Sequence, residues 1–182
     1  GSDRISVQEE LDRVLPVISS LAGTGVAISI DTMRTEVARA AVDAGACMVN
    51  DVSGGKADPD MLSYVATLNT PYILMHWRGP SNIMNTLTDY NDVAADVTAE
   101  ISKQVEVAVA AGIARDRIAI DPGIGFAKTV AQNWPILKHL DVLEELGLPI
   151  LMGASRKKFL GELLAKEGVA RDSDERESAT TA

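Results

Sequence analysis

Apolar residues along this chain follow two different spacings, which alternate from one end to the other. Short runs rich in Val and Ile predict strands, because such runs suit a sheet that is covered on both faces. Apolar residues that recur every three or four positions predict helices. Strands are expected at 26–32, 47–55, 72–76, 117–126 and 149–153, and helices at 6–21, 37–45, 58–66, 93–109, 134–147 and 156–164, with another helix starting at 179–182.

Several of these helices carry local boundary signals. Ser6 and Glu9 fit a capping box at the start of the first helix, and Pro16 is expected to kink or split that helix. Asp58 and Pro59 form an N-cap and first-turn pair. The helix at 93–109 has an apolar residue at every fourth position: Val93, Val97, Ile101, Val105 and Val109.

Strands that alternate with helices predict β-α units and hence a parallel sheet. A doubly wound sheet and a TIM (β/α)₈ barrel both fit the order of elements. The barrel is favoured because its strand ends converge on one site, whereas those of an open sheet spread along an edge. Polar residues lie at or just after the end of each predicted strand: Asp31, Asn50, His76, Asp121 and Ser155. Eight units need about 250 residues, so residues 1–182 are predicted to form one domain with about five units of a barrel.

Composition and charge narrow the possible partners. The formal net charge of −9 argues against a nucleic-acid or membrane surface, since both are anionic. Cys47 is the only cysteine, which favours a reducing, cytoplasmic location. No apolar run approaches the roughly 18 residues of a membrane span, and no signal peptide is visible. Gly1 and Ser2 fit either native sequence or a cloning scar.

The acids and the amide at the strand ends suggest a binding site. Taken singly, Asp31 could cap the following helix, while Asn50 and Asp121 could be turn residues. Together on one rim, they favour a site for a flat heterocycle, because a carboxylate accepts two hydrogen bonds from an N–C–N edge. A desolvated carboxylate would also stabilise positive charge that develops on such a ring.

Three consecutive cations, Arg156, Lys157 and Lys158, open the last long helix. Cations are disfavoured at this end of the helix dipole, by about 1 kcal/mol or less each, so their presence calls for an explanation. Together with the helix N–H groups they would form an anion site beside the acids. A purely solvated position is an alternative for Lys158.

Three further residues have competing interpretations. Phe126 lies in a loop and is a candidate stacking surface, but it could equally fold onto the core. A structural hydrogen bond explains His76 better than a metal site does, since His139 is the only other histidine. Met75 is expected inside the barrel, where it could form a pocket wall. The polar loop at 76–85 is of the kind that covers a barrel mouth.

Five motifs carry a resemblance to a known family. "SIDT" (29–32), "MVNDVSGG" (48–55), "LMHWRG" (74–79), "DPGIGFAKT" (121–129) and "GASRKKFLG" (153–161) resemble, in this order and spacing, the dihydropteroate synthase family of pterin-binding enzymes. Members of that family are (β/α)₈ barrels, and these segments are similar to their strands three to seven. Two departures are Lys158, where many members have serine, and Ile124, where an aromatic residue is frequent.

The resemblance implies a specific activity and site. The family condenses 6-hydroxymethyl-7,8-dihydropterin pyrophosphate with 4-aminobenzoate in folate biosynthesis, by an SN1-like route, and sulfonamides inhibit it. Asp31 and Lys157 would be catalytic. The residues implied to bind the pterin are Asp31, Asn50, Met75, Asp121, Leu151, Gly153 and Lys157. Those implied on the aminobenzoate side are Phe126, Ser155, Arg156 and Lys158.

The same resemblance implies Mg²⁺, with its ligand in a segment that this chain does not carry, and a possible homodimer. The chain by itself is therefore expected to be incomplete for activity. Two alternatives stay open: a methyltetrahydrofolate-dependent methyltransferase, disfavoured by the charge of "SRKK", and a non-catalytic pterin-binding paralogue. Binding of pterin without a response to aminobenzoate or pyrophosphate would favour the paralogue.

Overall fold

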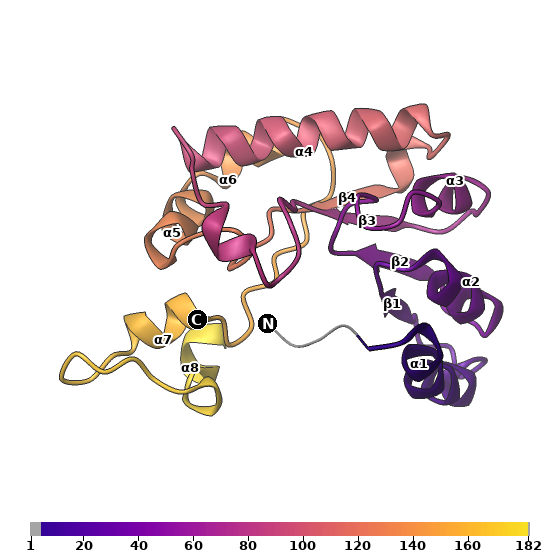
Figure 1. The fold of residues 1–182 in the computed structure, drawn as a ribbon, viewed down its shortest axis with the longest axis horizontal. Helices are drawn as coiled ribbons and strands as arrows, with labels where there is room; N and C mark the ends of the chain where they lie inside the picture. Colours follow the sequence, from indigo (N-terminus) through magenta and orange to yellow (C-terminus); the bar gives the residue numbers. More distant parts are fainter. Residues whose placement is uncertain (1–4, 182) are drawn as a thin grey trace.

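A computed structural model of the chain describes residues 5–181, so Gly1, Ser2 and Ala182 lie outside the described residues. Four parallel strands form one sheet (Figure 1): β1 (Ser29–Asp31), β2 (Met48–Asp51), β3 (Tyr72–Met75) and β4 (Ile118–Asp121). Their spatial order is the same as their order in the sequence. A doubly wound sheet reverses its strand order part-way, whereas a barrel adds each strand beside the last. The predicted α/β class is confirmed, and the sheet is part of a barrel.

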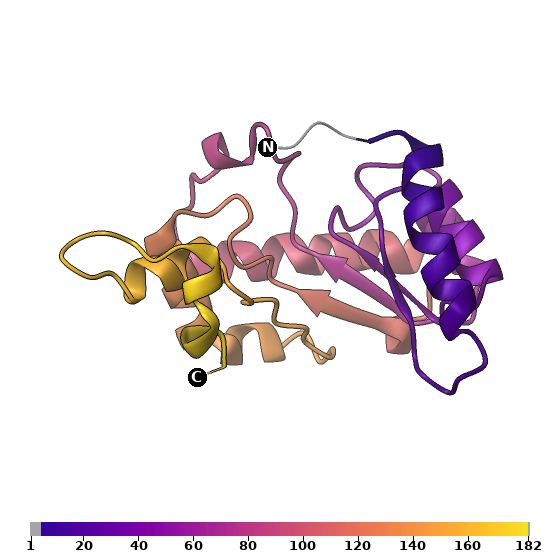
Figure 2. The same ribbon diagram turned by 90° about the horizontal axis from the view of Figure 1, so that it is seen from below.

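One helix precedes β1, and helices follow the strands. They are α1 (Val7–Leu21), α2 (Thr35–Asp43), α3 (Met61–Ala66), α4 (Val93–Ala110), α5 (Val130–Lys138), α6 (Leu140–Glu144), α7 (Lys158–Leu163) and α8 (Glu177–Thr181), with 3₁₀ turns at Met84–Thr86, Arg115–Arg117 and Ser173–Glu175. In Figures 1 and 2, α1, α2 and α3 lie at one end of the molecule and α7 and α8 at the other. The carboxyl ends of the strands point toward the α7–α8 end (Figure 2).

The pleat of the strands divides their residues between two faces. Ile30, Val49, Leu74 and Ile120 belong to the hydrophobic core, and all four are less than 5% exposed. They pack with residues of α2, α3 and α4, including Val37, Val65 and Ile101. The neighbouring positions of each strand therefore point to the opposite face, the inside of the barrel.

The fifth predicted strand, 149–153, is wrong in extent. Only Ile150 forms a bridge, parallel to Ile120. The Ile120 N–H donates to the Pro149 carbonyl and the Leu151 N–H to the Ile120 carbonyl, both at 2.8 Å. The segment thus follows β4 along one edge, and among residues 5–181 no strand pairs with its other edge.

Two helix predictions also need correction. Pro16 does not split α1, which is continuous; Pro16 is exposed, so water can satisfy the carbonyl that loses its partner. The stripe on α4 ends at Ala108 (0% exposed) rather than at Val109 (40% exposed). Steps of four residues turn about 40° beyond a full turn, so the fifth member of such a series leaves the buried face.

The other helix boundaries in the structure differ slightly from the predicted ones. The helix predicted at 134–147 is two helices, α5 and α6, which meet at His139. Ser6 caps α1 as expected, because its Oγ accepts from the Glu9 N–H at 3.1 Å. The N-cap predicted at Asp58 is wrong by two residues, because α3 begins at Met61 with Asp60 as its N-cap; Asp58 instead accepts from the Asp60 N–H at 3.0 Å. The sequence signals therefore placed most helix ends correctly to within a few residues.

Candidate functional site

The inner face of the sheet carries the polar residues predicted at the strand ends. Asp31 pairs with Asn50 in the ladder, and Met75 pairs with Asp121. Each lies one position from a core residue of its own strand, so all four side chains lie on the inner face. Tertiary structure therefore brings together a carboxylate, an amide, a thioether and a second carboxylate.

Asp31 and Asn50 contact each other directly. The Asn50 Nδ2 donates to Asp31 Oδ2 at 3.2 Å. The Asn50 Oδ1 is buried and has no hydrogen-bond partner among residues 5–181, which leaves an acceptor directed to this face. Burial, and next the Asp51 carboxylate, raise the pKa of Asp31, while the Asn50 hydrogen bond and Lys157 lower it. The pair could meet both a donor and an acceptor on a bound molecule.

Asp31 does not cap helix α2, the alternative role considered for it. The first N–H groups of α2 bond elsewhere: Thr35 N–H donates to Asp58 Oδ2 at 2.8 Å, and Arg34 N–H donates to Thr32 Oγ1 at 3.2 Å. Asp31 is thus left facing the inside of the barrel.

Asp121 ends β4 and starts a tight turn. Its Oδ1 accepts from the Gly123 N–H at 2.7 Å, so the turn role considered for it is confirmed. Burial raises the pKa of Asp121, and the positive charges of Lys157 and Lys128 oppose this effect. Oδ2 faces Gly153: a Cβ added there would lie 3.7 Å from that oxygen. Gly153 is therefore the immediate neighbour of this carboxylate oxygen.

Lys157 is the cation that reaches the acids. Its Nζ lies 4.0 Å from the centroid of the Phe126 ring, a cation–π distance. Burial lowers the pKa of Lys157, and the carboxylates of Asp121 and Asp31 raise it. A positive group at the rim thus lies within electrostatic range of both acids, next to an aromatic ring.

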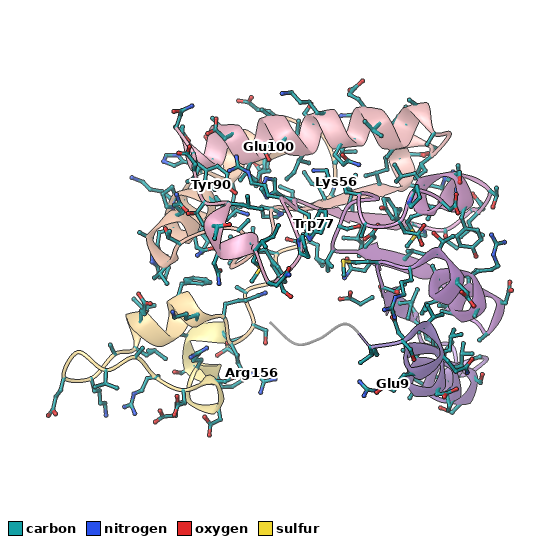
Figure 3. All side chains as sticks on the ribbon, viewed as in Figure 1. Glu9, Lys56, Trp77, Tyr90, Glu100 and Arg156 are labelled. Atoms are coloured by element: carbon teal, nitrogen blue, oxygen red, sulfur yellow. The ribbon has the colours of Figure 1, made fainter. Side chains whose placement is uncertain are left out.

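The other predicted rim residues lie differently. Helix α7 starts only at Lys158 and has six residues, and Arg156 precedes it with φ 49°. The Arg156 N–H donates to Thr180 Oγ1 at 3.0 Å, and Figure 3 shows its side chain at the α7–α8 end. The side chains of Ser155, Arg156 and Lys158 are exposed, and Leu151 is 41% exposed. The structure thus brings one of the three cations to the acids, and the roles of the others stay predictions.

A pocket of about 810 Å³ opens at the carboxyl ends of the strands. Each strand contributes to its lining through the loop that follows it: Met33 after β1, Val52 after β2, Trp77 after β3 and Phe126 after β4. Lys56 also lines it and donates to the Trp77 carbonyl at 3.0 Å; both are labelled in Figure 3. The loop at 76–85 forms part of this wall, as expected for a barrel mouth.

A buried polar network beside the site was not foreseen in full. The predicted structural hydrogen bond of His76 is confirmed, because its Nε2 lies 2.9 Å from Glu100 Oε2. Arg78 Nε donates to the same oxygen at 3.1 Å, and its guanidinium lies 3.7 Å over the Tyr90 ring. Figure 3 labels Glu100 on α4 and Tyr90 before that helix starts. Lys128 is the fifth member: its Nζ lies 3.1 Å from His76 Nδ1.

The network shifts the acid–base properties of its members. Burial, and then the charge of Lys128, lower the pKa of His76 to about 3. Burial would raise the pKa of Glu100, but hydrogen bonds from Arg78 and His76 lower it to about 2. Burial lowers the pKa of Lys128 to about 7. Lys128 stands in the quoted "DPGIGFAKT" motif, but nothing in its local sequence indicated that it would be buried.

Among residues 5–181, no group of three or more His, Cys, Asp and Glu side chains is arranged to hold a metal ion. Within the same residues, every helix is too short or too polar to cross a bilayer.

Three comparisons relate the chain to known proteins. A family model described as "pterin binding enzyme" matches residues 1–182. The dihydropteroate synthase of Mycobacterium leprae is 49% identical over 182 residues, which cover 99% of this chain and 64% of that protein.

Two solved structures are also similar. The Xanthomonas albilineans dihydropteroate synthase with 4-aminobenzoic acid has a TM-score of 0.88 and 41% identity, over 98% of this chain and 62% of that one. The Yersinia pestis dihydropteroate synthase with a sulfonamide drug complex has a TM-score of 0.91 and 36% identity, over 99% of this chain and 64% of that one. The chain spans a little under two thirds of the length of these relatives.

Proposed function

The chain belongs to the pterin-binding enzyme family, and from this premise we propose that it carries the pterin and arylamine sites of a dihydropteroate synthase. The proposed reaction joins 6-hydroxymethyl-7,8-dihydropterin pyrophosphate to 4-aminobenzoate and gives 7,8-dihydropteroate and pyrophosphate. One observation carries the proposal: Asp31, Asn50 and Asp121 share the inner face of the sheet, with Lys157 within electrostatic range of both acids.

The pterin is proposed to lie against this inner face. The carboxylates of Asp31 and Asp121 accept hydrogen bonds from ring and amino N–H groups, and the free Asn50 Oδ1 accepts another. Met75 and Gly153 are proposed as residues that wall the pterin site, with Gly153 next to Asp121 Oδ2. Leu151 is proposed as a further wall residue by resemblance.

The chemistry follows from the charges. In an SN1-like route the C–O bond to pyrophosphate breaks first and leaves a cationic methylene conjugated with the pterin ring. Desolvated carboxylates stabilise such a cation more than the uncharged pterin ring of the substrate, so Asp31 and Asp121 are proposed to lower the barrier. The arylamine nitrogen then attacks the methylene carbon, forms the C–N bond and releases a proton. The positive charge of Lys157 is proposed to stabilise the negative charge of the pyrophosphate as it leaves.

The arylamine is proposed to lie on the Phe126 side of the mouth. The Phe126 ring lines the pocket and is close to the Lys157 ammonium, a pair that suits an aromatic carboxylate. Ser155, Arg156 and Lys158 are proposed as outer contacts for the carboxylate. Two related structures, described with 4-aminobenzoic acid and with a sulfonamide drug complex, support this substrate and sulfonamides as inhibitors.

Several finer features rest on the resemblance alone. They are the use of Mg²⁺ and a homodimer. A cytoplasmic location is proposed on a different ground, the single cysteine of the sequence. The described residues offer no cluster for a metal ion, so no step of the proposed reaction is assigned to one.

Binding of the pterin pyrophosphate, measured by isothermal titration calorimetry, tests the proposal. The wild-type protein should bind it, and Asp121→Asn should bind it roughly 10- to 100-fold more weakly, because a hydrogen bond to a charged group contributes about 1.5–3 kcal/mol. Lys138→Met, an exposed lysine on α5, is the matched control and should bind like the wild type. No binding by the wild type, or equal binding by Asp121→Asn, would overturn the proposal.

A second measurement separates the synthase from the alternatives. Formation of 7,8-dihydropteroate from the pterin pyrophosphate and 4-aminobenzoate by the intact protein supports the synthase. Pterin binding that 4-aminobenzoate and pyrophosphate leave unchanged indicates a non-catalytic paralogue. Preference for methyltetrahydrofolate indicates a methyltransferase.

A further inference from the structure

The loop between Asp121 and Lys128 has an unusual backbone. Gly123, Gly125 and Ala127 all have positive φ, of 67°, 78° and 48°. Left-handed backbone is unfavourable for alanine, and glycine loses much conformational freedom when it is fixed. A loop of this kind keeps one conformation only when its surroundings hold it there.

The Lys128 side chain binds two carbonyl groups of this loop. Its Nζ donates to the Gly123 carbonyl at 3.1 Å and to the Phe126 carbonyl at 3.0 Å, and it lies 3.1 Å from His76 Nδ1. Lys128 is 7% exposed. A lysine ammonium has three donors, and all three are used here. Lys128 is therefore not free to bind substrate or to abstract a proton.

The third contact ties the loop to rigid elements. For His76 Nδ1 to accept from Lys128, the proton of the neutral ring must lie on Nε2, where it is donated to Glu100 on α4. Glu100 is in turn held by Arg78. The loop after β4 is thus cross-linked through His76, at the end of β3, to the longest helix of the chain.

Two further contacts act on the same loop. The Gly125 N–H donates to Asn133 Oδ1 at 2.7 Å, and the Tyr90 hydroxyl donates to the Ala127 carbonyl at 2.9 Å. Asn133 is 2% exposed. Lys128 differs from both because it bonds two carbonyls three residues apart, and thereby sets the curvature of the segment that ends in Phe126.

We propose that Lys128 is a positioning residue for the arylamine side of the site: it fixes the loop so that Phe126 lines the mouth beside Lys157. The inference rests on the proposed function and deepens it. The backbone of Asp121 is held in the ladder of β4, and only its Oδ1 contacts the loop, through the Gly123 N–H, so the pterin side should depend on Lys128 less than the arylamine side does.

The position of Lys128 also predicts a pH effect. The charged and titratable groups that face it are His76, Asp121, Glu100, Arg78 and Lys157. Burial lowers the pKa of Lys128 to about 7, so the ammonium loses a proton, and one of its three donors, when the pH rises above that value. The loop should loosen in mildly alkaline solution.

Steady-state kinetics of the intact protein test the positioning role of Lys128 and its pH dependence. Lys128→Met keeps the length of the side chain and removes its donors; it should raise the KM for 4-aminobenzoate about tenfold and change the Kd for the pterin pyrophosphate less than threefold. In the wild type, the KM for 4-aminobenzoate should rise above pH 7 as Lys128 loses its charge. Lys128→Arg should have a KM close to that of the wild type at pH 7 and should show no such rise, since arginine stays charged. Lys138→Met is the exposed control and should match the wild type. Equal KM values for the wild type and Lys128→Met would overturn the inference.

A measurement without substrate keeps this test separate from that of the proposed function. The amide resonances of Gly123 and Gly125 in ¹⁵N NMR spectra should shift with pH around 7 in the wild type and stay constant in Lys128→Arg. If the wild type fails to bind the pterin pyrophosphate, the proposed function fails, while this titration still reports on Lys128. The absence of any such shift in the wild type would refute the pH effect. At pH 6, identical Gly123 and Gly125 resonances in the wild type and Lys128→Met would refute the positioning role.

Discussion

Replacement of His76 by asparagine should remove a specific, pH-dependent loss of stability. His76 is buried against Lys128 and Glu100, and its pKa is lowered from 6.5 to about 3, first by burial and then by the charge of Lys128. The unfolded chain binds a proton at this imidazole below pH 6.5, but the folded chain does not do so until about pH 3. The stability associated with a neutral His76 is therefore present above pH 6.5 and is lost as the pH falls toward 3.

The size of the loss follows from the pH interval. Each pH unit in this range costs about 1.4 kcal/mol, so roughly 1.5 units between pH 6.5 and pH 5 remove about 2 kcal/mol of unfolding free energy. Glu100 does not contribute in this interval, because its pKa falls from 4.5 to about 2 and its stabilisation is lost only below the higher value. Asparagine at position 76 can still accept from Lys128 through Oδ1, which keeps part of the network.

Urea unfolding at pH 8 and pH 5 measures this effect. The wild type should lose about 2 kcal/mol more than His76→Asn between these two values. Both proteins carry the same carboxylates and the same Lys128, whose pKa is about 7, so these contributions cancel in the difference between their profiles. His139→Gln removes the other, exposed histidine and is the matched control, expected to keep the wild-type loss. Parallel profiles for the wild type and His76→Asn would show that His76 titrates normally and would refute the reasoning.

Two further predictions concern backbone and core. Gly123→Ala should destabilise the protein by about 2–4 kcal/mol, because its φ is 67° and a Cβ would lie 2.7 Å from the His76 carbonyl oxygen; Gly147→Ala, with φ 64° and open space, should cost only about 1 kcal/mol in the same thermal unfolding assay. Similar costs for the two would show that the clash relaxes. Ile101→Ala in α4 should cost about 2–5 kcal/mol in urea unfolding, whereas the exposed Val107→Ala should stay near 0.5 kcal/mol. A small cost at Ile101 would contradict its place in the core.

Some residues of the candidate site could be predicted from the local sequence, and others could not. Asp31, Asn50 and Asp121 were identified because each ends an apolar run, and parallel strands that follow one another in a barrel have their ends at the same rim. Lys157 was identified as part of a group of three cations, but local sequence could not select it from Arg156 and Lys158. That selection depends on the turn at Arg156, with φ 49°, and on the place of the Phe126 ring.

Apart from a structural hydrogen bond of His76, the network around Lys128 could not be predicted from the sequence. Lys128 and His76 are 52 residues apart, and His76 and Glu100 are 24 residues apart. No period or local spacing connects them. They meet because the sheet places the end of β3 beside β4, and α4 packs next to both.

By itself, the sequence determined the succession of strands and helices, most helix ends, the barrel class and the acids at the strand tips. These features depend on periodicity, capping and chain order, which act over a few residues or are written directly in the sequence. Only the tertiary structure decided that the fifth strand pairs through one residue, that Lys157 is the cation beside the acids, and that Lys128 is buried under the Phe126 loop. Such contacts arise between segments far apart in the chain, and their geometry is set by packing and by the need to pair every buried polar group.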